Sequence, residues 1–219
     1  MVTDGKTAAF LQGREFLAFG SLLNAVPEED LYYVNFGDPS VLKYFSSNLL
    51  TIHRRKYGVL AAAYTRYFGY QWYTNSTQVN ELGYLLCGFP ARDLKNMSPK
   101  TFKELETDLI NKVEKCGVKY AQALFDIAIH PEAYGRPYMW SPHDISHLSA
   151  LFICIPEDDI SSLKLEAMPS ISENMMKTMH QRKLEFFTMQ QILRFNPKAR
   201  RVYVLRMQLR DSLDMSKIT

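Results

Sequence analysis

The chain has 219 residues, of which 47% are hydrophobic and 22% are charged. This composition indicates a folded protein and excludes an intrinsically disordered one. Its 26 basic and 23 acidic residues leave a net charge of only +3, which argues against nucleic acid, or an acidic membrane surface, as a partner recognised by charge.

One phrase occurs three times along the chain. Its copies are FGSLLNAVPEEDL (residues 19–31), LGYLLCGFPARDL (residues 82–94) and LSALFICIPEDDI (residues 148–160). Each copy has large apolar residues at helical spacing, then a proline, then an aspartate three positions later. The nearly even offsets between the three copies define a long period. Such a period predicts a stacked array of helical units, because one unit cannot bury its apolar face alone.

Prolines are expected to mark the corners between helices. Pro90, Pro131, Pro156 and Pro197 recur in repeat register, and Pro90 suits the first position of a helix whose first turn holds Asp93. Further helix starts are expected where a capping residue precedes a proline, at residues 38–39, 98–99 and 141–142. Continuous helices are expected near residues 16–26, 56–68, 76–88 and 141–154. Residues 203–207 are the only plausible strand, and helix is as plausible there.

Two segments resemble the repeat of the mesothelin, stereocilin and otoancorin family. LGYLLCGFPARDLKNMSPKTF (residues 82–102) carries an L-G-x-L segment and a P-x-x-[DE]-[LI] corner. DIAIHPEAYGRP (residues 126–137) is similar to a second phrase of that family, with His130 in place of the usual asparagine, which Asn196 keeps in the next repeat. The resemblance spans roughly residues 16–199. It implies an armadillo-like α-superhelix, an extracellular role in adhesion between cells or between cell and matrix, and no catalytic residues.

The expected fold is all-α: a right-handed armadillo-like superhelix of short helices, with three repeats that are each about 63–66 residues long. Residues 1–219 would form a single array, with repeat cores near residues 16–78, 79–144 and 145–210. The N-terminus lacks the apolar core of a signal peptide and the C-terminus lacks a hydrophobic anchor tail. If the protein is secreted, we therefore expect this chain to be a piece of a longer precursor.

The chain contains three cysteines, Cys87, Cys116 and Cys154. Three are too few for a disulfide scaffold, and an odd number leaves at least one unpaired or joined to another chain. The sequence leaves two alternatives open for the others, a disulfide or buried free thiols that serve as small apolar residues.

Two asparagines match the N-glycosylation pattern, Asn75 in Asn-Ser-Thr and Asn96 in Asn-Met-Ser. Asn75 is the better candidate, because it precedes a helix in a polar turn. Asn96 is followed by Ser98 and Pro99, where the hydroxyl is a candidate helix cap. Such patterns also arise by chance.

Residues 64–73 form the densest aromatic cluster of the chain. Tyrosine and tryptophan are favoured at protein interfaces, so these residues are candidates for binding a partner. The alternative interpretation is a core between repeats and its cover. The candidate residues are Tyr64, Tyr67, Tyr70, Trp72 and Tyr73.

The segment HDISH (residues 143–147) places two histidines four positions apart, a spacing that a zinc helix also shows. No third ligand suggests itself, and Asp144 suits a capping role in the first turn. We therefore expect helix capping by Asp144 and a solvent-facing His147. A zinc hydrolase remains a weak alternative.

The leading functional hypothesis is a non-enzymatic adhesion or attachment module, extracellular or at the cell surface, that contacts protein partners. A lipid anchor would then lie in a part of the protein outside this chain. The alternative is an intracellular helical-repeat scaffold that binds proteins or peptides. Neither hypothesis calls for a cofactor, a metal, nucleic acid or a membrane span within these residues.

Overall fold

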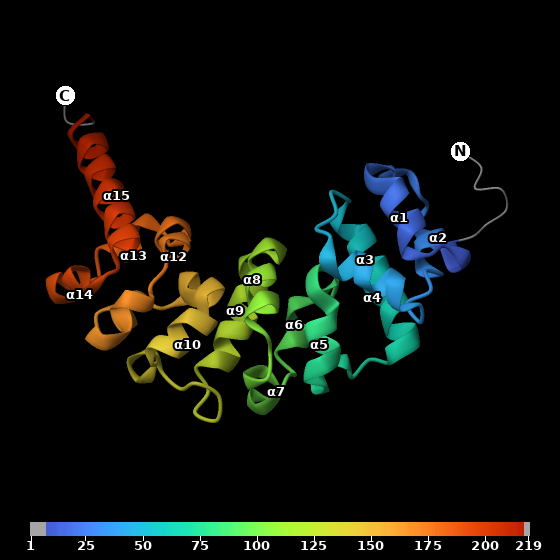
Figure 1. Ribbon diagram of the computed structural model, residues 1–219, viewed down its shortest axis with the longest axis horizontal. Helices are drawn as coiled ribbons and strands as arrows, with labels where there is room; N and C mark the ends of the chain where they lie inside the picture. The colour runs from blue at the N-terminus through green and yellow to red at the C-terminus, as the bar shows by residue number, and fades with distance from the viewer. Residues whose placement is uncertain (1–7, 217–219) are drawn as a thin grey trace. The chain divides into compact units, whose positions relative to one another are not determined.

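The computed structural model describes residues 8–216, and over this range the regular structure is entirely helical, with no β-strand. The chain divides into two compact units, Met1–Ala123 and Leu124–Thr219, each built of short helices (Figure 1). The helix α9 (Val118–Ala128) contains the boundary between them. The all-α class is therefore confirmed.

The first unit consists of α-helices and short 3-10 helices, which are labelled η. Before α9, its elements are η1 (Ala8–Phe10), α1 (Gly13–Phe19), η2 (Gly20–Ala25), α2 (Glu28–Tyr32), α3 (Pro39–Ser47), α4 (Arg54–Phe68), η3 (Trp72–Thr74), α5 (Ser76–Leu82), η4 (Gly83–Gly88), α6 (Ala91–Leu94), α7 (Pro99–Lys103) and α8 (Thr107–Cys116).

The second unit has the same character and ends in a longer helix. Its elements are η5 (Pro137–Met139), α10 (Pro142–His147), η6 (Ser149–Cys154), α11 (Glu157–Ile160), η7 (Leu165–Ser170), α12 (Glu173–Thr178), α13 (Gln181–Leu184), α14 (Met189–Arg194) and α15 (Pro197–Ser216). Residues 203–207 lie within α15, so this segment is helical.

The three copies of the phrase fold into the same succession of elements: an α-helix, a 3-10 helix, a proline corner and a short α-helix. These successions are α1–η2–α2, α5–η4–α6 and α10–η6–α11. When the three copies are aligned, the corresponding elements of each succession start at matching positions. The repeat inferred from the sequence is therefore a repeat of local structure.

The expected continuous helices 16–26, 76–88 and 141–154 are wrong in their middles, where each changes from α-helix to 3-10 helix. Glycine causes the change in two copies, because Gly20 and Gly83 have φ values of 46° and 49° that an α-helix does not allow. The third copy has Ser149 there, and the preceding Leu148 turns the chain with φ −85° and ψ 13°. At Gly83 a Cβ would also lie 2.1 Å from the Ser46 carbonyl oxygen, so close packing on α3 requires glycine as well.

The corner prolines and the capping residues lie where the sequence predicts them, with one shift. Pro27, Pro90 and Pro156 each occupy the N-cap position, so the helix after Pro90 begins at Ala91 and not at the proline. Pro131 lies in the turn after α9, and Pro197 begins α15. The side chains of Asp38, Ser98 and Ser141 each accept a hydrogen bond from a backbone N–H of the following helix.

Each 3-10 helix of the phrase ends with carbonyl groups that a later side chain binds. In the first copy, Lys56 Nζ donates to the carbonyls of Leu23, Asn24 and Val26. In the third, Lys183 Nζ donates to Ile153 O (2.6 Å) and Ile155 O (2.7 Å). In the second, the Tyr120 hydroxyl lies 2.8 Å from Cys87 O and 2.7 Å from Phe89 O. These bonds satisfy polar groups that the end of a helix leaves free.

The apolar slot that the phrase repeats is buried in two copies and exposed in one. Leu85 and Leu151 have no exposed surface, whereas Leu22, in the same slot of the first copy, is 51% exposed. The helix α3 precedes η4 and packs against it. Only η1 and α1 precede η2 among the described residues, so Leu22 lacks an equivalent cover.

Candidate functional site

Three exposed tyrosines surround one arginine on the first unit. The guanidinium carbon of Arg66 lies 5.1, 5.4 and 5.1 Å from the ring centroids of Tyr32, Tyr33 and Tyr67. The tyrosines are 41%, 53% and 45% exposed. We call these four residues the tyrosine–arginine cluster. Each cation–π contact stabilises the arrangement, so the rings and the guanidinium present an ordered surface.

The cluster lies at the C-terminal end of α4, where the apolar face of this helix is no longer fully covered by other elements. Tyr57, Leu60, Ala61 and Tyr64 are buried at the spacing of one helical face. This face continues to the C-terminal end of the helix, where Tyr67 and Phe68 are 45% and 36% exposed. The helix α2 packs against α4 and brings Tyr32 and Tyr33 beside Arg66.

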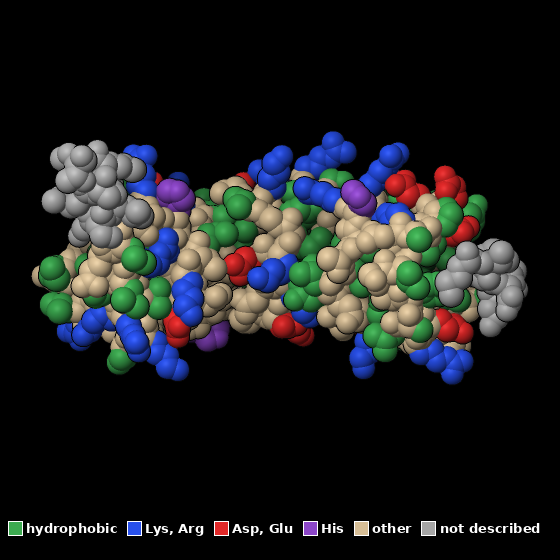
Figure 2. All heavy atoms as spheres, turned by 90° about the horizontal axis from the view of Figure 1, so that it is seen from above, with side chains coloured by type: hydrophobic (Ala, Val, Ile, Leu, Met, Phe, Trp, Pro, Cys, Tyr) green, Lys and Arg blue, Asp and Glu red, His purple; other side chains and the backbone are tan. Residues whose placement is uncertain are grey.

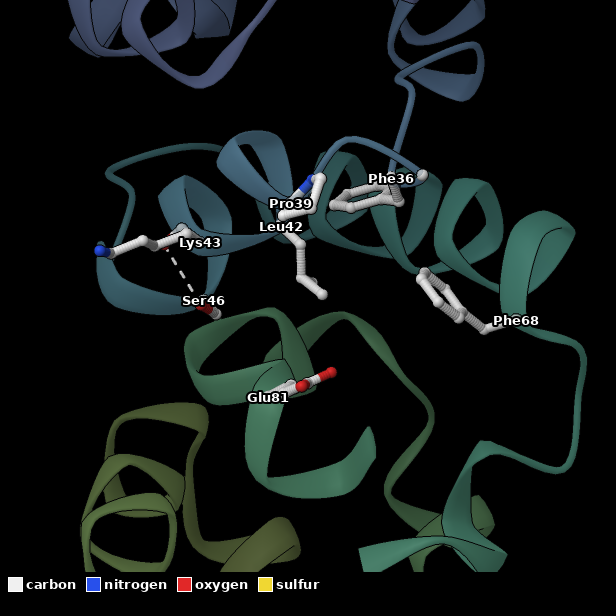
Figure 3. Close-up of a pocket in the computed structure, with 8 residues that line it drawn as sticks. Phe36, Pro39, Leu42, Lys43, Ser46, Phe68 and Glu81 are labelled. Carbon is white, nitrogen blue, oxygen red and sulfur yellow. Dashed lines mark hydrogen bonds between the residues drawn. The ribbon is translucent and has the colours of Figure 1, made fainter. Parts of the chain in front are cut away.

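A hollow of about 480 Å³ adjoins the cluster (Figure 3). In Figure 3, the side chains of Leu42 and Glu81 point into it from opposite sides, Phe68 flanks it and Lys43 points away. Gly37 connects the hollow to the cluster, since a Cβ built on it would lie 3.5 Å from the Tyr67 ring. The hollow is lined by Phe36, Gly37, Pro39, Leu42, Lys43, Ser46, Phe68 and Glu81.

Below this surface lies a buried hydroxyl group. Tyr64 has no exposed surface, its ring stacks on Phe68 at 4.5 Å, and its hydroxyl has no hydrogen-bond partner among the described residues. Burial, followed by the charge of Glu81, raises the pKa of Tyr64, so the hydroxyl keeps its proton. The surface thus offers apolar area, aromatic faces and charges of both signs, which suits protein side chains better than a small metal or a phosphate.

The predicted aromatic residues divide between core and surface. Tyr64 and Trp72 are 0% and 2% exposed, so the interpretation of these two as surface groups is wrong and they are core residues. Tyr67 and Tyr70 are 45% and 83% exposed, and Tyr73 is half-buried. Sequence reasoning missed Tyr32 and Tyr33, because they are far from Arg66 in the sequence and only the packing of α2 on α4 brings them together.

Two of the cysteines are joined. Cys87 in η4 and Cys116 in α8 form a disulfide with a Cα–Cα distance of 4.7 Å. The free-thiol alternative is therefore wrong for this pair. Cys154 is a buried thiol, and burial raises its pKa to about 11, so it stays protonated and unreactive.

Both candidate glycosylation sites are exposed. Asn75 is the N-cap of α5, and its Oδ1 accepts from the N–H groups of Thr77 (3.0 Å) and Gln78 (3.3 Å). A glycan is attached at Nδ2, so capping through Oδ1 is compatible with it. After Asn96, the Ser98 hydroxyl accepts from Thr101 N at 3.0 Å, which is the capping role expected for that hydroxyl.

In HDISH, Asp144 and Ser141 form a capping box at the start of α10, as predicted. His147 is half-buried and not solvent-facing, because its ring lies beside those of Tyr134 and His143. Within residues 8–209, no group of three or more His, Cys, Asp or Glu side chains is placed to hold a metal ion.

The same described part of the chain contains no helix with both the length and the apolar character needed to cross a membrane. Figure 2 shows Lys and Arg side chains interspersed with Asp and Glu on the face it presents. No protein-family model matches the chain, and neither a curated protein nor a solved structure matches it. A proposal about function therefore rests on the sequence and on the geometry described above.

Proposed function

We propose that this chain is a non-enzymatic adhesion or attachment module, extracellular or at the cell surface, that binds a protein partner. The observation that carries the proposal is the tyrosine–arginine cluster beside its hollow. Tyrosine and arginine are enriched among the residues that dominate binding energy at interfaces. Here they are ordered before binding, which lowers the entropy cost of association.

The Cys87–Cys116 disulfide supports the extracellular location. Structural disulfides form and persist in oxidising compartments and are rare in the cytosol. The exposed acceptor asparagines Asn75 and Asn96 agree with a secreted glycoprotein. The intracellular scaffold is disfavoured by the disulfide.

We further propose that the repeats stack as a right-handed armadillo-like superhelix similar to the mesothelin, stereocilin and otoancorin family. Two findings support stacking. The three copies share one succession of elements, and the main contacts within each unit join elements close in the chain, such as α1 with α3, α2 with α4 and α10 with η7. Contacts of this short range are typical of solenoids, in which a repeat packs only on its neighbours.

Cell adhesion to beads coated with the secreted protein tests the function. Tyr33→Ala/Tyr67→Ala should reduce adhesion about tenfold or more, since hot-spot truncations cost at least that much. Tyr138→Ala is the matched control, because Tyr138 is a tyrosine of similar exposure (52%) in the second unit. Adhesion that is unchanged in the double variant, or equally reduced in the control, would rule out the cluster.

The compartment is tested separately by expressing the chain behind a secretory leader in eukaryotic cells. Without reduction, the denatured secreted protein should expose one thiol, that of Cys154, and glycosidase should lower its mass by more than it lowers the mass of the Asn75→Gln variant. Three free thiols in secreted protein without glycan would favour the intracellular scaffold.

A further inference from the structure

A second hollow, separate from the tyrosine–arginine cluster, lies over the disulfide of the first unit. It has a volume of about 500 Å³, within the range of sites for small ligands. Its apolar wall is formed by Leu49, Leu50 and Ile52, from the loop between α3 and α4, and by Tyr57. The disulfide-bonded pair Cys87 and Cys116 also lines it.

Two cations line this second hollow, Arg54 and Lys115, and none of the nine residues described as lining it is acidic. Arg54 is held in place, since its Nη2 donates to the Tyr120 hydroxyl at 3.3 Å and its guanidinium lies 5.7 Å from the Tyr120 ring centroid. Lys115 precedes Cys116, so the disulfide fixes the backbone beside it. Two positive groups face an apolar surface with no carboxylate among the lining residues to neutralise them.

The loop that supplies the apolar wall is also fixed. Leu50 N donates to the Tyr57 hydroxyl at 2.7 Å, and Thr51 O accepts from Asn24 Nδ2 at 2.6 Å. The loop nevertheless leaves Leu49 50% exposed. A large apolar side chain held at the edge of a cationic hollow has the character of a binding wall, because covering it with a ligand removes apolar area from water.

We infer that this hollow binds a small organic anion with an apolar body, the carboxylate lying between Arg54 and Lys115 and the body against Leu49, Leu50 and Ile52. Arginine and lysine supply charge-assisted hydrogen bonds to a carboxylate. The apolar wall is removed from water only when an apolar group covers it. The ligand therefore needs an apolar body as well as a carboxylate. This binding is independent of the adhesive role proposed for the tyrosine–arginine cluster.

Calorimetric titration with octanoate tests the inference on the oxidised protein, with 1-octanol, octylammonium and acetate as comparison ligands. Octanoate should bind saturably, whereas octanol and octylammonium lack the negative charge and acetate lacks the body. Arg54→Gln and Lys115→Gln should each weaken octanoate binding about fivefold or more, as expected for loss of one charged contact. Leu49→Ser should weaken it as well.

Lys100→Gln is the matched control, because Lys100 is an exposed lysine of α7 that does not line the hollow. It should leave octanoate binding unchanged, and equal melting temperatures would show that the variants are folded. Equal binding of octanol, equal binding of acetate, or binding unaffected by both cation substitutions would overturn the inference. So would binding of an acidic–apolar peptide, such as acetyl-Leu-Glu-amide, in the absence of octanoate binding.

Discussion

In both the first and the second copy of the repeated phrase, a residue of the 3-10 helix is joined to a later segment of the chain. Hydrogen bonds make this connection in the first copy, and a disulfide makes it in the second. In the first copy, Asn24 Nδ2 donates to Thr51 O, and His53 N donates to Asn24 Oδ1 at 3.1 Å. In the second, Cys87 is bonded to Cys116. Cys87 and Cys116 stand at the repeat positions that Asn24 and His53 occupy, because the offset that carries Phe19 to Leu82 also carries each residue of the first pair to its counterpart.

The contact between the carbonyls at the end of the 3-10 helix and a later side chain also differs in chemistry between the two copies. The ammonium of Lys56 binds three carbonyls in the first copy, whereas the Tyr120 hydroxyl, with one proton to donate, lies beside two in the second. The repeat thus determines where the 3-10 helix has to be tied to the structure that follows. The local residues determine whether a charge, an amide or a covalent bond does so.

The largest effect is expected at the repeated leucine slot, which is buried in the second and third copies and exposed in the first. Leu85→Ala and Leu151→Ala should each lower the free energy of unfolding by about 2–5 kcal/mol, the range for a buried leucine replaced by a cavity. Leu22→Ala is the control within the repeat and should cost less than about 1 kcal/mol, because Leu22 is exposed. Urea unfolding measures all three, and an equal loss for Leu22→Ala would contradict the assigned faces.

The next largest effect is expected on removal of the disulfide, which distinguishes the second copy from the first. Cys87→Ser/Cys116→Ser should destabilise the protein by about 3–4 kcal/mol, because the bond closes a loop with a sequence separation of 29 residues. Chemical denaturation of the variant, compared with the oxidised parent, measures this. A parent that denatures identically with and without reductant would contradict it.

The converse substitution sharpens the comparison. Asn24→Cys/His53→Cys places a cysteine pair at the matching points of the first copy. If the two copies are equivalent, the pair should oxidise to a disulfide, which a non-reducing peptide map would detect. Failure of this pair to oxidise, while Cys87 and Cys116 remain joined, would show that the equivalence ends at the level of sequence.

Sequence reasoning located the repeat, the proline corners and the caps because each depends on residues close together in the chain. The phrase around Pro27, Pro90 and Pro156 is a local pattern, and its elements begin at matching positions. The change to 3-10 helix is not visible in the sequence, because Gly20 and Gly83 stand within a continuous apolar pattern of helical spacing. Only the positive φ and, at Gly83, the close approach of Ser46 O give these glycines their role.

The candidate site was less predictable for a related reason. A stretch rich in tyrosine and tryptophan has the same composition in a core as on a surface, so the sequence could not separate Tyr64 from Tyr67. Nor could it place Tyr32 and Tyr33 against Arg66, since that contact depends on how α2 packs on α4. The disulfide could not be anticipated from the sequence, because the match of Cys87 and Cys116 to Asn24 and His53 becomes informative only once the structure shows that Asn24 and His53 are in contact.

A smaller effect is expected where a lysine closes the 3-10 helix. Lys56→Met should cost about 2–3 kcal/mol, because it leaves the carbonyls of Leu23, Asn24 and Val26 without their charged donor. Lys183→Met should cost less, since Lys183 is half-buried and its lost bonds are more readily replaced by water. Thermal melts compare these variants with Lys119→Met, a control at an exposed lysine. A Lys56 variant as stable as that control would refute the stabilising role of Lys56 at the end of the 3-10 helix.

The smallest effect concerns the third copy, where His147 is half-buried and its counterpart Glu81 in the second copy is exposed. Burial, followed by the charge of His143, lowers the pKa of His147 below 6.5, against the opposing influence of Asp144. A depressed pKa means that the folded state resists protonation. The stability gained is present above pH 6.5 and is lost as the pH falls through the lower pKa of the folded state.

Acidification should therefore destabilise the parent through His147. His147→Gln should make the urea midpoint less sensitive to a change from about pH 7.5 to about pH 5.5. The contribution should stay below about 1 kcal/mol, because water screens a half-exposed ring. His143→Gln is the comparison variant: the His143 ring is exposed and its Nδ1 lies 4.0 Å from Asp144 Oδ1, so this substitution should change the pH dependence less than His147→Gln does. An unchanged pH dependence in the His147→Gln variant would contradict this prediction. The half-buried ring of His147 would then not resist protonation and would behave like an exposed side chain, which is what Glu81 is at this position of the second copy.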